Sequence, residues 1–369
     1  MIKCEDIYEK KSINFIWYCF LYCANSFIIF FLNEKYTINF KKSDINNFLS
    51  TYKMPNDDID IVRIVDEVIY GTHTDLEKNG DLFLTLGIFT FNTEKSDFNY
   101  YENTKDNRIV DFYITDDGRI YTVNVEYYNN YYKWNLMLNF DINIASGIIL
   151  DFFSYPTLLI SNDDVYIAYI NNLIDQNSII QYFNVSKIEN EELKPIVSLK
   201  GILDNNEGSF VNDISRVLLD NKNLVYVYES EEKQFLVKFD IDKNEEIVLY
   251  ETEDDNSTIY SYLLHGDILY YQIIFDEQKN TSELNLVNSK SNKSLLGKTI
   301  YTFENYLNGN ILMHNKDNSW KLYDISNNKI TNISVEKDDF FPKYHILKEN
   351  TIVAIDYKNE IYIGNLERK

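Results

Sequence analysis

The segment Thr258–Gly297 reads TIYSYLLHGDILYYQIIFDEQKNTSELNLVNSKSNKSLLG. Its aromatic and aliphatic residues form short runs, and polar turn residues at His265-Gly266-Asp267 and Asp276–Asn280 interrupt them. Short β-rich runs that Gly, Asn and Asp turns separate are typical of antiparallel strands. The segment therefore predicts four strands, of which Thr258–Leu264 is the first and Ile268–Phe275 the second.

A short pattern recurs where such runs end. An apolar or aromatic residue is followed by Asp or Asn, and usually then by an aliphatic residue. The seven copies are Phe91-Asn92-Thr93, Phe140-Asp141-Ile142, Phe183-Asn184-Val185, Phe239-Asp240-Ile241, Val287-Asn288-Ser289, Tyr323-Asp324-Ile325 and Gly364-Asn365-Leu366. They lie about 36 to 56 residues apart, and a repeat of roughly 40–45 residues with four strands is typical of a β-propeller blade.

A second pattern stays in phase with the first. Once in each period a polar turn leads into a β-rich run, as in Asp117-Gly118-Arg119-Ile120-Tyr121. The two patterns together predict an all-β fold, a β-propeller of about seven four-stranded blades, with six or eight blades as alternatives. The last copy stops at Arg368-Lys369 after its third strand. We therefore expect Tyr36–Phe40 to supply the fourth strand and close the ring, which removes an exposed sheet edge.

The runs that end in Tyr323–Lys329 and Phe239–Asn244 resemble those of bacterial propellers of the TolB-like and related uncharacterised kind. The resemblance covers about residues 60–366 and is generic. It implies a propeller fold and a binding scaffold, without indicating a particular ligand. WD40 repeats are not matched, because Trp134 precedes Asn135 and Trp320 precedes Lys321 instead of Asp.

The expected division is an N-terminal segment, residues 1–33, before a propeller domain, residues 34–369. Ile13–Leu32 contains no charged residue and reads INFIWYCFLYCANSFIIFFL. Because about 20 apolar residues suffice for a helix to cross a bilayer, we expect membrane association through Ile13–Leu32, with the large domain outside the cytoplasm. The alternatives are a secreted protein whose signal peptide is cleaved near Ala24-Asn25-Ser26, and a cytoplasmic protein on which the segment packs.

The chain is strongly acidic, with a net charge of −23. Such a surface repels phosphate backbones, so we expect no nucleic-acid partner. Cys4, Cys19 and Cys23 are the only cysteines and all precede residue 24, so the body of the protein has no disulfide framework or thiolate metal site. Nothing in the sequence indicates a cofactor.

Residues with catalytic or metal-binding chemistry show no recognised spacing. His73, His265, His314 and His345 fall at different points of different repeats. The acidic doublets, among them Asp57-Asp58 and Asp116-Asp117, are interpreted as solvated turns. No G-x-S-x-G elbow, phosphate-binding glycine loop or calcium loop is present. The sequence therefore assigns no catalytic, cofactor-binding, metal or ligand-binding residue.

These observations favour a non-enzymatic scaffold that recognises a protein, peptide or glycan partner through loops on one propeller face. The longest interval between repeats contains Gly201–Asp213 (GILDNNEGSFVND), which is either a binding loop or a neutral insertion. The alternative function is that of a hydrolase or lyase with an acidic site in the central funnel of the propeller.

Overall fold

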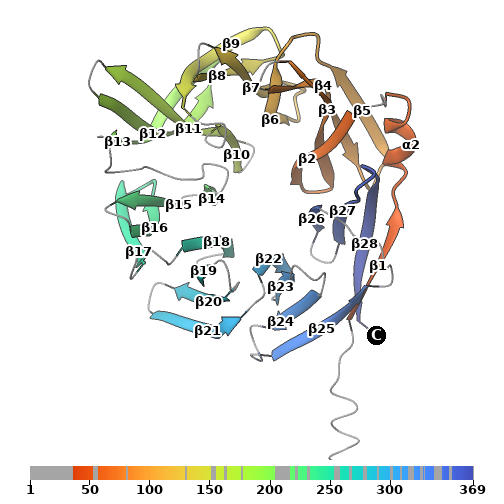
Figure 1. Cartoon of the computed structure of the whole chain (residues 1–369), viewed down its shortest axis with the longest axis vertical. Helices are drawn as coiled ribbons and strands as arrows, with labels where there is room; N and C mark the ends of the chain where they lie inside the picture. The colour runs from red at the N-terminus through yellow and green to blue at the C-terminus, as the bar shows by residue number, and fades with distance from the viewer. Residues whose placement is uncertain are drawn as a thin grey trace, which may run out of the picture.

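The structure is a computed structural model of the whole chain (Figure 1). The residues that it describes are 36–52, 57–79, 82–128, 131–150, 155–161, 164–175, 178–203, 217–220, 223–230, 233–252, 258–265, 268–276, 281–288, 291–299, 302–307, 310–314, 320–324, 327, 329–335, 343–348 and 351–368.

Five sheets of four antiparallel strands follow one another along the chain. The strands of the first three sheets are β2 (Asp57–Val65), β3 (Val68–Asn79), β4 (Leu82–Asn92) and β5 (Asp97–Glu102); β6 (Arg108–Ile114), β7 (Ile120–Tyr128), β8 (Tyr131–Leu138) and β9 (Ile142–Ile149); and β10 (Thr157–Ser161), β11 (Asp164–Asp175), β12 (Ser178–Glu189) and β13 (Glu192–Leu203). The strands of the next two are β14 (Leu218–Asp220), β15 (Asn223–Ser230), β16 (Lys233–Asp240) and β17 (Glu245–Glu251); and β18 (Thr258–His265), β19 (Ile268–Asp276), β20 (Thr281–Asn288) and β21 (Ser291–Thr299).

A sixth sheet has eight strands and combines both ends of the described chain. In spatial order its strands are β22 (Thr302–Leu307), β23 (Asn310–His314), β24 (Trp320–Asp324), β25 (Lys329–Val335), β1 (Tyr36–Lys42), β28 (Ile361–Arg368), β27 (Thr351–Ile355) and β26 (Lys343–Lys348). A short helix, α2 (Ile45–Leu49), follows β1.

The sheets stand around a common axis, with β2, β6, β10, β14, β18, β22 and β26 nearest to it (Figure 1). Each four-stranded sheet begins with its innermost strand and runs outward through successive hairpins. The prediction of an all-β chain with a propeller architecture is therefore confirmed.

The predicted division into about seven four-stranded blades is wrong. Among the described residues there are five four-stranded sheets and one eight-stranded sheet. The sequence pattern counted the hairpins around Tyr323-Asp324 and Gly364-Asn365 as two separate blades, whereas both belong to the eight-stranded sheet. A repeat pattern records hairpins and carries no information about which hairpins share a hydrogen-bonded sheet.

The N-terminal strand β1 explains this difference. It pairs antiparallel with β28, from Tyr36 opposite Arg368 to Lys42 opposite Tyr362. Its other edge pairs in parallel with β25, with Tyr36 opposite Ile333. The strand therefore lies inside a larger sheet. These pairings show neither the separate last blade that we expected nor the ring closure that this blade was to provide.

Several of the recurring Asp and Asn residues lie in the turn after the third strand of a sheet, whereas Asn184 and Asn365 lie inside β12 and β28. Asp240 ends β16, and its Oδ1 accepts a hydrogen bond of 3.1 Å from the backbone N–H of Lys243. Asp324 ends β24 and accepts the N–H of Asn327 in the same way, also at 3.1 Å. Short acceptor side chains stabilise such turns, which is why the pattern recurs at this point of the repeat.

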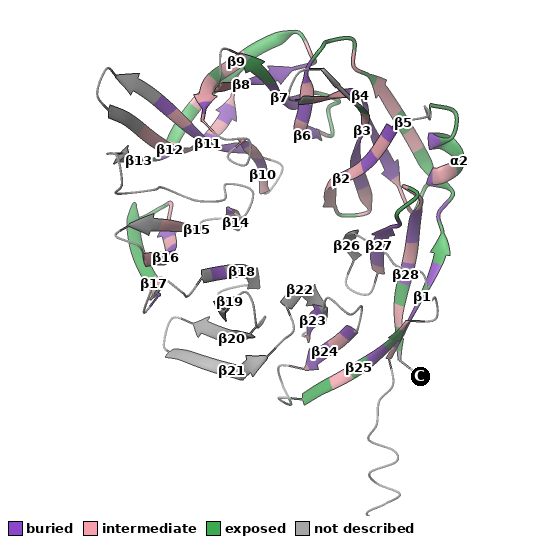
Figure 2. Ribbon diagram, viewed as in Figure 1, coloured by how far each residue is buried: buried purple, intermediate pink, exposed green. Residues whose placement is uncertain are grey.

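Apolar residues between neighbouring sheets form the core (Figure 2). Along β2, the side chains of Asp57, Ile59 and Ile61 are buried, while those of Asp58 and Asp60 on the other face are half-buried. Ile59 and Ile61 belong to a cluster that includes residues of β27 and β28. The first four-stranded sheet therefore packs one face against the eight-stranded sheet and presents the other toward β6.

Two predicted features lie largely outside the described residues. Ile13–Leu32 is wholly outside them, as are the three cysteines and positions 204–213 of the long insertion. Gly201, Ile202 and Leu203 end β13. Across the described ranges, we find no helix of the length and apolar character needed to cross a membrane.

Candidate functional site

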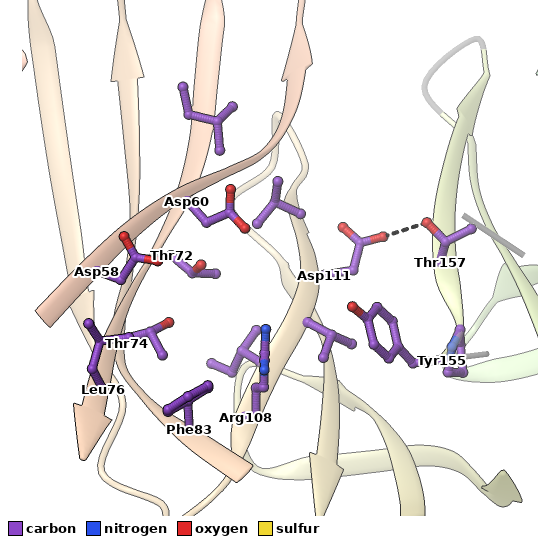
Figure 3. Close-up of a pocket in the computed structure, with 15 residues that line it drawn as sticks. Asp58, Asp60, Thr72, Thr74, Leu76, Phe83, Arg108, Asp111, Tyr155 and Thr157 are labelled. Carbon is purple, nitrogen blue, oxygen red and sulfur yellow. Dashed lines mark hydrogen bonds between the residues drawn. The ribbon is translucent and has the colours of Figure 1, made fainter. Parts of the chain in front are cut away.

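A cavity of about 410 Å³ lies between the first two sheets and the segment that enters the third (Figure 3). Its volume is within the range of about 300–1,000 Å³ that is usual for small-molecule sites. We call it the β2–β6 pocket. It is lined by Asp58, Asp60, Ile61, Val62, Thr72, Thr74, Leu76, Phe83, Arg108, Ile109, Val110, Asp111, Tyr155, Pro156 and Thr157.

The position of the pocket follows from the hairpin topology. Asp58, Arg108 and Thr157 lie near the starts of β2, β6 and β10, the innermost strands of three consecutive sheets. Strand β3 runs antiparallel to β2, so the second half of β3, with Thr74 and Leu76, meets the start of β2. The pocket thus lies on the propeller face at which the inner strands begin.

Four polar side chains form one wall through two cross-strand pairs. Asp58 lies opposite Thr74, and Asp60 lies opposite Thr72. Side chains of directly opposite residues share one face of a sheet, with their Cβ atoms about 5 Å apart. Figure 3 shows these four residues on one side of the pocket, facing the region bordered by Arg108 and by Asp111, Tyr155 and Thr157.

An irregularity in β2 places Arg63 on the same face as this wall. The register between β2 and β3 shifts between Ile61 and Arg63, so Arg63 pairs with Tyr70 while Asp60 pairs with Thr72. In a regular strand, residues 60 and 63 point to opposite faces. The bulge returns Arg63 to the face of Asp60, as bulges near functional sites often redirect a side chain.

Asp111 forms an ion pair with Arg63 and accepts hydrogen bonds from β10, so it connects three consecutive inner strands. The guanidinium of Arg63 binds both carboxylate oxygens of Asp111, with Nε 3.1 Å from Oδ1. The other donors to this carboxylate come from β10, the Thr157 hydroxyl at 3.0 Å and the Leu158 N–H at 2.7 Å. Asp111 is buried and its charge is compensated, so it forms a rigid wall of the pocket.

Asp58, Thr72 and Thr74 differ from Asp111, because within the described ranges their side chains are not bound by groups from other strands. Within the described part of the chain, the Asp58 carboxylate accepts one hydrogen bond, from the adjacent N–H of Ile59 at 3.0 Å, and pairs with no cation. Across the same ranges, the hydroxyls of Thr72 and Thr74 make no hydrogen bond, although Thr72 is only 5% exposed. Because buried polar groups are normally satisfied, these groups are available to a ligand.

A second polar cluster backs this wall on the opposite face of the same two strands. His73 Nε2 lies 2.6 Å from the carboxylate of Asp57, and His73 Nδ1 lies 2.9 Å from the Tyr100 hydroxyl. Since a carboxylate only accepts, Nε2 carries a proton and donates it to Asp57. Burial, followed by the charge of Glu102, raises the pKa of Tyr100 to about 12, so the phenol stays neutral. This cluster fixes the strand ends that carry Asp58 and Thr74.

No site residue was predicted from the sequence, so the β2–β6 pocket was not foreseen. Asp57 and Asp58 were interpreted as a solvated turn, yet both lie in β2, where Asp57 is buried against His73 and Asp58 faces the pocket. By contrast, Asp117 does lie in an exposed turn, where it pairs with Arg119. The strand alternation that places Asp58 and Asp60 on one face is visible in the sequence, but it does not reveal the facing wall.

The four histidines, for which the sequence predicted no role, lie in four different strands. Among the described residues, no group of three or more His, Cys, Asp and Glu is placed to hold a metal ion. His73 lies in β3, whereas His265, His314 and His345 belong to β18, β23 and β26.

The lining of the β2–β6 pocket offers carboxylates, hydroxyls, one guanidinium and apolar surface from Leu76, Phe83 and Tyr155. This combination suits a small ligand that has hydrogen-bond donors and an apolar face.

Comparisons with known proteins show the fold. No protein-family model matches the sequence, and no curated protein is significantly similar to it. Among solved structures, an oligogalacturonate lyase in complex with manganese has a TM-score of 0.54 at 9% identity, covering 85% of this chain and 90% of that chain. An oligogalacturonate lyase from Vibrio parahaemolyticus has a TM-score of 0.52 at 11% identity, covering 90% of this chain and 98% of that chain. The polysaccharide lyase Uly1 has a TM-score of 0.50 at 11% identity, covering 85% and 90%. These similarities indicate a common architecture and do not single out the TolB-like propellers.

Proposed function

We propose that this protein is a binding propeller that holds a saccharide unit of a glycan in the β2–β6 pocket. One observation carries the proposal: the pocket presents the Asp58 carboxylate and the hydroxyls of Thr72 and Thr74, which the described chain leaves open to a ligand. Such groups hydrogen-bond to adjacent hydroxyls, which donate and accept in turn. The described residues thus supply the recognition chemistry without a catalytic step.

The other pocket walls support a saccharide ligand. Leu76, Phe83 and Tyr155 contribute apolar or aromatic surface on which the C–H face of a sugar ring can pack. Arg108, across the pocket from Asp58, is a fixed cation that donates to ring or hydroxyl oxygens. The likeness to polysaccharide-acting proteins supports the same ligand class, because three neighbours with TM-scores of 0.50 to 0.54 are named as such lyases.

Charge argues for a neutral or positively charged saccharide over a polyanion. The chain has a net charge of −23, and Asp58 and Asp60 face the same cavity. Repulsion between these carboxylates and a uronate would oppose binding of an oligogalacturonate. The expected ligand is therefore a saccharide like those of the named neighbours, but one without the negative charges of an oligogalacturonate.

Calorimetric titration of the full-length protein with neutral oligosaccharides of glucose, mannose, galactose and N-acetylglucosamine tests this function. We expect at least one to bind, and Thr72→Val to weaken its binding about fivefold through loss of one hydrogen bond. The matched control is Thr90→Val, because Thr90 is also buried in this sheet but lies outside the pocket lining. Absence of binding by every sugar, or equal affinities for the two variants, would overturn the proposal.

A lyase that cleaves an acidic polysaccharide is the second candidate, and the names of the three neighbours favour it. In that reaction a base removes the proton next to the uronate carboxylate, a carbon–carbon double bond forms, and the glycosidic C–O bond breaks with its electron pair on the departing oxygen. Incubation with oligogalacturonate, with and without manganese, distinguishes the candidates. Ultraviolet absorbance of the unsaturated product that grows with time would support the lyase, and a flat signal would support the binding propeller.

A further inference from the structure

The polar wall of the β2–β6 pocket has the arrangement that a positively charged amine requires. An ammonium group carries three N–H donors and no acceptor. Asp58 and Thr74 form one cross-strand pair, Asp60 and Thr72 form the next pair, and all four face the cavity. The wall therefore presents a carboxylate and two hydroxyl acceptors on one face of the sheet, toward the same cavity.

The charges in the pocket are not balanced. Arg63 compensates Asp111, and the other charged residues of the lining are Asp58, Asp60 and Arg108. This leaves an excess of one negative charge. Asp58 has no cationic partner within the described ranges. A cationic group of a ligand would therefore gain the most interaction free energy by binding at this carboxylate.

The burial of Thr72 favours a ligand group that hydrogen-bonds to its hydroxyl. Thr72 is only 5% exposed, lines the pocket, and has no hydrogen bond for its hydroxyl within the described part of the chain. A threonine that is buried next to two carboxylates normally donates or accepts a hydrogen bond. An ammonium group that donates to Thr72 and Asp58 satisfies both, and its interaction with Asp58 is stronger here than at a fully solvated site.

We infer that the saccharide carries a free amino group, so that the ligand class is an amino sugar whose ammonium binds Asp58 together with the hydroxyls of Thr72 and Thr74. This inference rests on the proposed saccharide-binding function and adds the chemical group that is selected. The sugar ring extends from the ammonium toward Arg108 and Tyr155 on the facing wall.

Titration of the full-length protein with oligomers of glucosamine and with the matched N-acetylated oligomers tests the inference. The two probes have the same ring and linkage, and only the first carries an ammonium. We expect the glucosamine oligomer to bind about tenfold more tightly, because a charged hydrogen bond contributes more than a neutral one. We also expect Asp58→Asn to remove this preference and higher salt to reduce it.

Asp44→Asn is the matched control, since Asp44 is exposed at the start of α2 and makes no side-chain cap hydrogen bond. It should leave both affinities unchanged. Thr74→Val is a second pocket variant, which should reduce the preference for the amine several-fold even where Asp58→Asn affects folding.

The outcomes separate the two proposals. If both oligomers bind with equal affinity, the amine inference is overturned and saccharide binding stands. If neither binds, the proposed function itself is overturned. If a lysine amide binds while the glucosamine oligomer does not, the pocket selects a peptide amine and the amino-sugar inference is wrong.

Discussion

Arg63 and Asp111 form a largely buried ion pair that joins the innermost strands of the first two sheets. The guanidinium of Arg63 also donates to the backbone carbonyl of Leu158 at 3.0 Å, so the pair reaches the third sheet. Both residues follow register shifts, between Ile61 and Arg63 in β2 and between Ile109 and Asp111 in β6. Two bulges therefore orient the residues that fix one wall of the pocket.

Removal of the Asp111 carboxylate should strongly destabilise the fold. We expect Asp111→Ala to cost about 3–5 kcal/mol, because Arg63 is left as an uncompensated charge and the Leu158 N–H loses its acceptor. Chemical denaturation followed by circular dichroism measures the change. Asp117→Ala is the control, because its carboxylate is exposed and pairs with Arg119 in its own turn. Equal midpoints for the two variants would contradict the role of the buried pair.

Alkaline pH should weaken the packing around Tyr100. Burial raises the pKa of this phenol to about 12, above its ordinary value of 10.0, so the folded state favours the neutral form. The associated stability is complete below pH 10 and is lost as the pH rises through about 12. In thermal melts between pH 9 and 12, Tyr100→Phe should lose less stability with rising pH than the parent protein. The exposed Tyr357 supplies the control Tyr357→Phe, which should follow the parent curve.

The interior position of β1 makes Ile38 important for stability. Its side chain is fully buried in a cluster with Leu312, Trp320 and Ile352. We expect Ile38→Ala to lower the free energy of unfolding by about 2–5 kcal/mol, as is usual for large-to-small core substitutions. Lys41→Ala, on the exposed side of the same strand, should change it by less than about 0.5 kcal/mol. A small effect of Ile38→Ala would show that β1 is not an integral strand of its sheet.

Gly87 should not accept a side chain. A Cβ atom at this position would lie 2.4 Å from the Tyr100 hydroxyl oxygen and from the adjacent ring carbon. Gly87→Ala must displace Tyr100 from His73, with an expected cost of about 1–3 kcal/mol. Thermal denaturation measures the cost, and a histidine NMR spectrum reports the lost hydrogen bond. An unchanged His73 signal would contradict the close approach of Gly87 to Tyr100.

The sequence predicted the features that depend on local chemistry. Asp240 and Asp324 mark turns because their side chains accept backbone N–H groups three residues later, and such marks recur in any sequence of hairpins. The strands Thr258–Leu264 and Ile268–Phe275 agree with β18 and β19 to within a residue at their ends. The all-β propeller followed from these marks.

Features that depend on contacts between distant segments were not predictable. The parallel pairing of Tyr36 with Ile333 joins strands far apart in the chain and produces the eight-stranded sheet, which the repeat pattern does not encode. The bulge before Arg63 changes the face of one side chain without any marker in the sequence. The Asp57-Asp58 doublet resembles a turn in composition, and only its pairing with β3 shows that it lies in a strand.

Crystals of the full-length protein soaked with glucosamine oligomers test the central claim most directly. We expect density for a sugar ring in the β2–β6 pocket, within hydrogen-bonding distance of Asp58 and Thr72. At a soak concentration near the dissociation constant of the parent protein, Thr72→Val crystals should show lower occupancy of the same site. An empty pocket at a saturating concentration, or a sugar bound only elsewhere on the propeller, would contradict it.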